Sequence, residues 1–174
     1  MELSDYKNIY VFAEQRDGKI QSVALELIGK ARELAAATGE QVVAILVGHK
    51  VKDDAQTLIE YGADKVVVVD NKIVKDYVTE QYSQALYQVI VEYKPSILMF
   101  GATTIGRDLA PRIAARLGTG LTADCTKLDI DEETKGLLMT RPAFGGNLMA
   151  TIMCPDHRPQ MGTVRPGVFK KVKV

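Results

Sequence analysis

Several features that would mark other classes of protein are missing from this sequence. Its two cysteines, Cys125 and Cys154, are too few for a disulfide scaffold. It has no basic surplus, since 22 lysines and arginines balance 22 aspartates and glutamates, and this argues against a general nucleic-acid binder. No apolar run approaches the roughly 20 residues that span a bilayer, and the first residues lack the order of a signal peptide. We therefore expect a cytoplasmic protein that binds neither nucleic acid nor membrane.

The motifs of several common activities are missing as well. The sequence contains neither a G-x-x-x-x-G-K-[ST] phosphate loop nor a G-x-S-x-G elbow, and no G-x-G-x-x-G follows the first predicted strand. The histidines, His49 and His157, and the two cysteines lack the spacing of metal ligands, so we predict no metal site. The missing dinucleotide fingerprint disfavours an NAD-dependent oxidoreductase.

Along the chain, the hydrophobic residues alternate between the spacing of buried strands and the spacing of helices. Hydrophobic residues make up 47% and charged residues 25% of 174 residues, which is typical of one compact domain. Short apolar runs predict buried strands over 8–13, 41–47, 64–69 and 96–100. Helical spacing predicts helices over 22–38, 53–61, 77–93 and 107–117. This alternation indicates the α/β class, with a mostly parallel open sheet flanked by helices.

The pattern changes after Gly118. Short strand-like pieces over 119–122, 125–130, 137–140, 147–153 and 161–164 are separated by Gly, Pro and Asp rather than by helices. They predict an antiparallel extension or a decorated sheet edge. Met149, Ile152, Met153 and Met161 make this region more apolar than a free edge should be, so we expect it to face a partner. The alternating apolar and basic residues of 168–174 predict a further strand.

Two stretches have the composition of binding sites. Residues 101–108 (Gly-Ala-Thr-Thr-Ile-Gly-Arg-Asp) follow a strand and open a helix, the place where an open α/β sheet binds ligands and where a helix N-terminus favours an anion. The alternative is a plain helix start, with Thr104 as its cap and Asp108 complementing the dipole. Residues 140–147 (Thr-Arg-Pro-Ala-Phe-Gly-Gly-Asn) present Arg141 from a rigid turn, or else form only a hairpin with Arg141 as a solvated charge at a strand end.

Taken in order with 158–167 (Arg-Pro-Gln-Met-Gly-Thr-Val-Arg-Pro-Gly), these stretches resemble the α subunit of electron transfer flavoprotein. The resemblance also includes 9–14, 62–66, 106–112, 114–118 and 121–125, and so runs through nearly the whole chain. It implies a nucleotide-binding-like domain of adenine nucleotide α-hydrolase type over 1–167. Residues 168–174 would begin a linker toward an FAD-binding domain whose glycine- and serine-rich segment is absent here.

The resemblance also implies a function. The chain would be part of an electron carrier rather than a self-contained enzyme, and would form a heterodimer with the electron transfer flavoprotein β subunit. FAD would be held by the complete heterodimer and not tightly by this chain alone, and an acyl-CoA dehydrogenase-type protein would be a redox partner.

Residues 140–147 are similar to the group that takes electrons from NADH and bifurcates them. That likeness places Arg141 toward the β-subunit flavin, where a fixed guanidinium stabilises a reduced, anionic flavin. Thr103, Thr104 and Arg107 are further candidates for cofactor binding, and no catalytic residue is predicted. The alternative is a stand-alone adenine-nucleotide-binding module of universal-stress-protein type, which would use 101–107 to hold the nucleotide but lacks the usual glycine-spaced phosphate loop.

Overall fold

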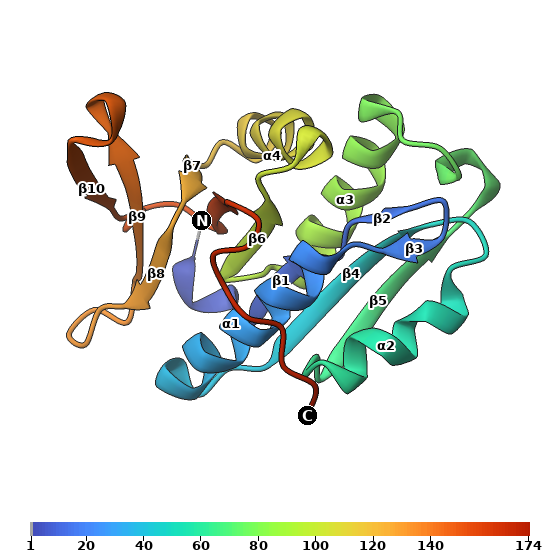
Figure 1. Cartoon of the computed structure of the whole chain (residues 1–174), viewed down its shortest axis with the longest axis horizontal. Coiled ribbons are helices and arrows are strands. Elements are labelled where there is room, and N and C mark those ends of the chain that lie inside the picture. The colour runs from blue at the N-terminus through green and yellow to red at the C-terminus, as the bar shows by residue number, and fades with distance from the viewer. Residues whose placement is uncertain (1) are drawn as a thin grey trace.

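A computed structural model describes residues 2–174 and shows a parallel sheet covered by helices on both faces (Figure 1). The sheet has six strands in the order β5-β4-β1-β6-β11-β7, and all neighbouring pairs are parallel. Its strands are β1 (Ile9–Phe12), β4 (Val42–Gly48), β5 (Lys65–Asp70), β6 (Ile97–Gly101), β7 (Leu121–Cys125) and β11 (Gln160–Val164). The predicted α/β class with a mostly parallel sheet is confirmed.

Four helices enclose the sheet. They are α1 (Ser22–Thr38), α2 (Ala55–Glu60), α3 (Thr79–Tyr93) and α4 (Thr104–Leu117). Glycines in the left-handed region end α1 and α4, with φ 76° at Gly39 and 68° at Gly118, as their position after the last apolar residue predicts. Short 3-10 turns cover Leu3–Asp5, Lys52–Asp54, Lys72–Val74 and Phe144–Gly146.

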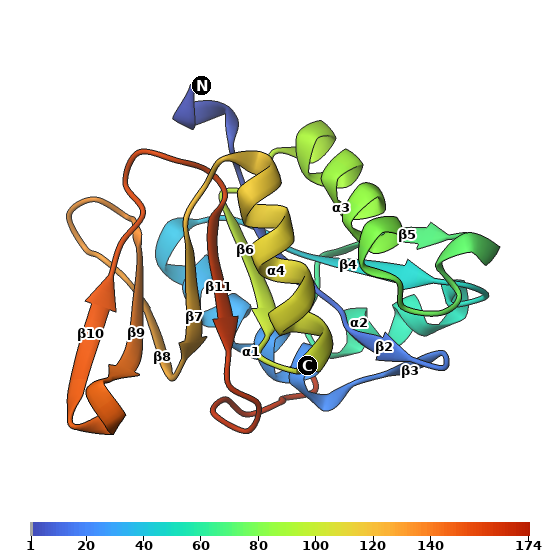
Figure 2. The ribbon, with the colours of Figure 1, turned by 90° about the horizontal axis from the view of Figure 1, so that it is seen from above.

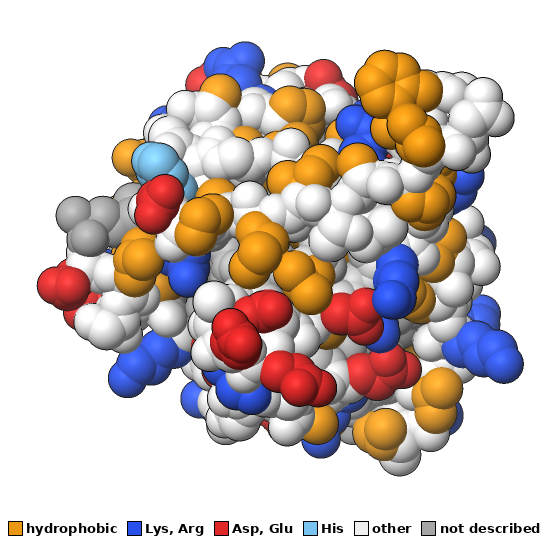
Figure 3. Space-filling model, turned by 90° about the vertical axis from the view of Figure 1, so that its left-hand side faces the viewer, with side chains coloured by type: hydrophobic (Ala, Val, Ile, Leu, Met, Phe, Trp, Pro, Cys, Tyr) orange, Lys and Arg blue, Asp and Glu red, His pale blue; other side chains and the backbone are white. Residues whose placement is uncertain are grey.

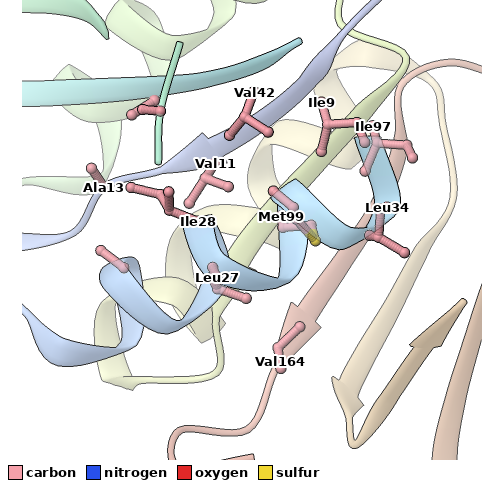
Figure 4. Packing of buried hydrophobic residues seen from close by; sticks show 14 of the residues in the cluster. Ile9, Val11, Ala13, Leu27, Ile28, Leu34, Val42, Ile97, Met99 and Val164 are labelled. Carbon is pink, nitrogen blue, oxygen red and sulfur yellow. The ribbon is translucent and has the colours of Figure 1, made fainter. Parts of the chain in front are cut away.

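The hydrophobic core has two parts, one on each face of the sheet, because successive side chains of a strand point to opposite faces. Ile9 and Val11 of β1 face α1, whereas Tyr10 and Phe12 face α3 and α4. On the α1 side the packing is continuous, as Figure 4 shows for Ile28 and Leu34 of α1 and Val11, Ile97, Met99 and Val164 of the strands. Because the strands are buried on both faces, they read in the sequence as unbroken apolar runs.

A second, antiparallel sheet branches off between β7 and β11. It consists of β8 (Lys127–Ile130), β9 (Leu137–Ala143) and β10 (Leu148–Ile152), and it stands beside the β7 edge of the main sheet (Figures 1 and 2). Leu128, Leu137 and Met139 extend the α1-side core into it. A two-stranded hairpin, β2 (Gln15–Arg16) with β3 (Lys19–Ile20), follows β1.

The structure corrects three expectations for the region after Gly118. The antiparallel extension is right for β8, β9 and β10 but wrong for β7 and β11, which are parallel strands of the main sheet. Met161 was expected on a partner-facing surface, but it is fully buried in β11 because that strand lies between β6 and β7. Residues 168–174 form no strand.

The tail instead lies along α1. The Gly167 N–H donates to Glu26 of α1 at 2.9 Å, and the Lys30 ammonium lies 5.3 Å from the Phe169 ring centre. The Val174 N–H donates to the Glu60 carbonyl at 2.9 Å. Residues 168–174 therefore pack on the domain, and their role as the start of a linker stays a prediction.

Candidate functional site

The chain reverses its order across the sheet between β1 and β6, and the carboxyl ends of these strands form the usual ligand site of such a fold. Here the chain's own side chains fill that place. Glu14, 2% exposed, accepts a hydrogen bond from the Thr103 hydroxyl. A Cβ on Gly101 would lie 2.8 Å from both γ-carbons of Val23. The crevice is thus closed by packing.

The three candidates from residues 101–108 have different surroundings. Thr103, not Thr104, is the N-cap of α4: its hydroxyl accepts from the Gly106 N–H at 3.0 Å, so the helix begins at Thr104 rather than at Arg107. Since the Thr103 hydroxyl also donates its proton to Glu14, it has no donor left for a ligand. Thr104 and Arg107 are exposed at the first turn of α4. A ligand role for these residues stays a prediction.

The ends of β7 and β11 hold an ion pair. Gly162 pairs with Thr122 and Val164 with Cys125, so β7 has one residue more than β11 between those pairs, which is a β-bulge at Asp124. Asp124 adopts a left-handed φ of 59°. Its carboxylate accepts two hydrogen bonds from Arg165, from Nε at 3.2 Å and from Nη2 at 2.7 Å.

Arg141 lies within a strand and not at its end. β9 continues through Arg141 to Ala143 and pairs Arg141 with Ala150 of β10. Pro142 fits there because β8 pairs with β9 only as far as Thr140, which leaves an open edge beside the proline. The Arg141 side chain is half-buried, and its Nε is buried with no hydrogen-bond partner among the described residues. Both interpretations from the sequence, a rigid turn that presents Arg141 and a solvated charge at a strand end, are therefore wrong.

The electrostatics join these residues into one site. The hydrogen bonds from Arg165 hold the pKa of Asp124 below its usual range, and the charges of Arg107 and Arg141 lower it further. We call these residues (Arg107, Arg141, Arg165 and Asp124) the arginine cluster. With three guanidinium groups and one carboxylate, it presents a net positive charge suited to an anion.

Buried Cys125 lies next to Asp124 in β7. Burial raises the pKa of its thiol to about 11, although the nearby charge of Arg141 acts in the opposite direction. The thiol is therefore neutral at physiological pH, which makes it a poor nucleophile. Among residues 2–174, no group of three or more His, Cys, Asp or Glu side chains is placed to hold a metal ion.

Sequence reasoning selected Arg107 and Arg141 from separate motifs, and the charges of both lower the pKa of Asp124. It missed Asp124 and Arg165 as site residues. The signal that could have found them is their position at the carboxyl ends of two parallel strands, but those strands were expected to be antiparallel.

Another cleft, of about 470 Å³, opens where β4 and β5 end. Lys50, Lys72 and Lys75 line it together with Asp17 and Asp76, so opposite charges largely cancel there. None of residues 101–107 lines this cleft, so the universal-stress-protein alternative, which would use those residues, stays a prediction.

The parallel sheet with its reversal beside β1 defines the class as a nucleotide-binding-like α/β domain. Residues 9–174 match the electron transfer flavoprotein domain family, and the chain belongs to this family. None of the helices in the described part of the chain is both long and apolar enough to cross a membrane.

Three relatives illustrate the family. The chain is 57% identical to electron transfer flavoprotein subunit alpha of Clostridium acetobutylicum, with 100% of this chain and 52% of the relative covered. It is 48% identical to acryloyl-CoA reductase electron transfer subunit beta of Anaerotignum propionicum, covering 99% and 53%. It is 49% identical to lactate dehydrogenase (NAD(+),ferredoxin) subunit LctC of Acetobacterium woodii, covering 97% and 40%. The chain spans about half the length of the curated relatives it matches.

Proposed function

We propose that this chain works as the N-terminal domain of an electron transfer flavoprotein α subunit. The whole subunit would pair with a β subunit, and the heterodimer would carry electrons between a donor and an acceptor through FAD. This domain would support the β subunit and lend side chains to its flavin site. Membership of the flavoprotein family and the similarity to named α subunits support the proposal.

The observation that carries the proposal is the unpartnered Nε of Arg141 within the arginine cluster. A buried N–H without an acceptor costs about 1–3 kcal/mol, and more for a charged group. If the Arg141 side chain turns toward a bound partner, an anionic acceptor there would remove that cost. The residues therefore fit the electron-rich edge of a reduced flavin.

Within such a site the flavin supplies the redox chemistry. Arg141 would donate a hydrogen bond to the ring and stabilise its negative charge, and two paired strands fix the backbone from which its side chain extends. Arg107 would add positive charge from the first turn of α4, with Thr103 and Thr104 beside it. Among these residues, Arg141 is the one with a buried donor to satisfy.

We propose that the heterodimer belongs to the NADH-linked, bifurcating group and that its acceptor is of acyl-CoA dehydrogenase type. The name of the Acetobacterium relative includes both NAD(+) and ferredoxin, which supports the first point. The name of the Anaerotignum relative includes an acyl-CoA substrate, which supports the second.

We also propose that the β subunit covers an apolar surface on the β9–β10 hairpin. Phe144 is 81% exposed, and Leu148 and Met149 are each 58% exposed. Ile152 and Met153 adjoin them, and we call these five residues the hairpin patch. Figure 3 shows hydrophobic side chains spread over this side of the molecule. A group of exposed apolar side chains of this size marks an interaction site, and here it lies next to Arg141.

The chain alone is not expected to hold FAD tightly, because its crevice between β1 and β6 is packed with Glu14, Val23 and Thr103. Purified by itself, it should pass through gel filtration colourless. Visible absorbance with stoichiometric flavin would contradict this expectation.

The proposal is tested by redox titration of the complete heterodimer. Arg141→Ala should lower the potential of the β-subunit flavin and impair NADH-driven bifurcation, because the reduced, anionic form loses its cation. About 1.4 kcal/mol of lost interaction corresponds to roughly 30 mV for a two-electron couple. Arg141→Lys should recover only part of the shift, since an ammonium lacks the planar fork.

Arg112→Ala is the matched control, because Arg112 is an exposed α4 arginine paired with Glu80 outside the cluster. It should leave the potential unchanged, and thermal melts of all variants should stay close to wild type. Unchanged flavin potential and NADH oxidation in Arg141→Ala would remove the proposed role. A collapse of its melting temperature would instead make Arg141 a structural residue.

A further inference from the structure

Asp124 is the carboxylate of the arginine cluster, and its position is closely fixed. Its N–H donates to the Thr163 hydroxyl at 2.8 Å, and its carboxylate accepts from Arg165 at both oxygens. Arg165 is fixed in turn, because its own N–H donates to the Cys125 carbonyl at 3.0 Å. The bulge in β7 turns Asp124 toward this partner.

The three arginines differ in how they interact with the Asp124 carboxylate. Arg165 is matched by two hydrogen bonds to a carboxylate, the strongest geometry for this pair. Arg141 lies close to Asp124 without bonding to it, because the Thr126 N–H donates to the Thr140 carbonyl at 2.9 Å and so joins the two segments. Arg141 and Arg107 interact with the carboxylate only through its charge. The positive field around Arg141 therefore depends on how much of the cluster's charge Asp124 compensates.

We propose that Asp124 is the counter-charge that sets the potential of the flavin bound next to Arg141. Its carboxylate removes one unit of positive charge from the cluster, and so keeps the flavin potential below the value that three uncompensated arginines would give. This inference rests on the proposed function of Arg141. Asp124 acts here through its neighbours and makes no contact with the flavin.

Asp124→Asn tests the negative charge of Asp124 separately from the shape of its side chain. Asparagine is among the residues best tolerated at positive φ, so the backbone at 59° is retained. The amide keeps the size of the side chain and one acceptor for Arg165. Asp124→Ala would combine the charge loss with strain and is less informative. Glu80→Gln is the matched control, because Glu80 is a carboxylate paired with an arginine outside the cluster.

Arg165→Gln provides the decisive comparison, because it breaks the same ion pair from the other side. If the pair were only structural, both substitutions would shift the flavin potential in the same direction. Charge balance gives opposite directions: Asp124→Asn adds a positive unit to the cluster and raises the potential, whereas Arg165→Gln removes one and lowers it. Both variants are measured by redox titration of the complete heterodimer, beside thermal melts.

The expected result is a higher potential in Asp124→Asn, a lower one in Arg165→Gln and no change in Glu80→Gln. Shifts of the same sign, or an unchanged potential in Asp124→Asn, overturn the role of Asp124. Neither result removes the proposed role of Arg141, which depends on Arg141→Ala in the same titration. If Asp124→Asn does not fold, Arg165→Gln still decides: a potential that does not fall overturns the proposal.

Discussion

A Cβ on Gly106 would stand 1.7 Å from the carbonyl oxygen of Gly101, so α4 begins in direct backbone contact with the end of β6. Residues 101–106 thus use their glycines for helix–strand packing. The contact has a functional consequence, because it fixes the first turn of α4, from which Arg107 reaches the field of Asp124.

Gly106→Ala should therefore be severely destabilising. Neither backbone can yield without moving a whole element, so we expect a loss of about 3 kcal/mol or more, the upper range for overpacking. Urea denaturation measures the loss. Gly120→Ala is the control, because its Cβ would meet only the Cys154 sulfur at 3.8 Å, an ordinary contact distance. Equal stability of the two variants would show that α4 can shift freely.

The order of helices and strands up to Gly118 follows from local sequence, because each apolar period there ends at a glycine or a polar turn. The position of β11 in the sheet does not follow from local sequence. Gln160–Val164 pairs with β6, about 60 residues earlier in the chain, and with β7 across the whole second sheet. A five-residue apolar run contains no information about such distant partners, and it was therefore assigned to an antiparallel edge.

The candidate site, like the fold, could be predicted only in part from the sequence. The sequence singles out Arg141, whose role stays a prediction, but not its burial, because Pro142 suggests a turn and not an edge strand. The hairpin after β1 was also missed as a strand pair, although Asp17-Gly18 is a strong two-residue turn signal and both residues have positive φ.

The two thiols should differ sharply in reactivity. Cys125 is fully buried with its pKa raised to about 11, whereas Cys154 is half-buried near the surface. A thiol reagent at pH 8 should modify Cys154 quickly and Cys125 only on unfolding. Cys154→Ser should remove the fast phase and keep the slow one. A fast phase that survives this substitution would show that the β7–β9 packing opens readily.

The lowered pKa of Asp124, caused mainly by its hydrogen bonds from Arg165, makes stability depend on acid pH. Its unfolded pKa is about 3.9, so the pair contributes fully above that pH. The contribution is lost as the pH falls from about 4 toward the lower folded pKa. Asp124→Asn cannot titrate, so its melting temperature should fall less between pH 5 and pH 3 than that of wild type. Equal acid slopes would mean that the ion pair does not contribute in solution.

The hairpin patch should carry much of the affinity for the β subunit. Phe144 is its most exposed member and has φ 49°, a backbone conformation that asparagine tolerates well. Phe144→Asn in the full-length α subunit should therefore leave the fold intact while it removes an aromatic anchor. Such anchors contribute 2 kcal/mol or more at an interface centre, so we expect binding to weaken at least about tenfold by calorimetry. Ile73→Asn is the control, because Ile73 is 62% exposed and lines a groove beside α3, away from β10. Wild-type affinity in Phe144→Asn, or an equal loss in Ile73→Asn, would show that the β subunit binds elsewhere.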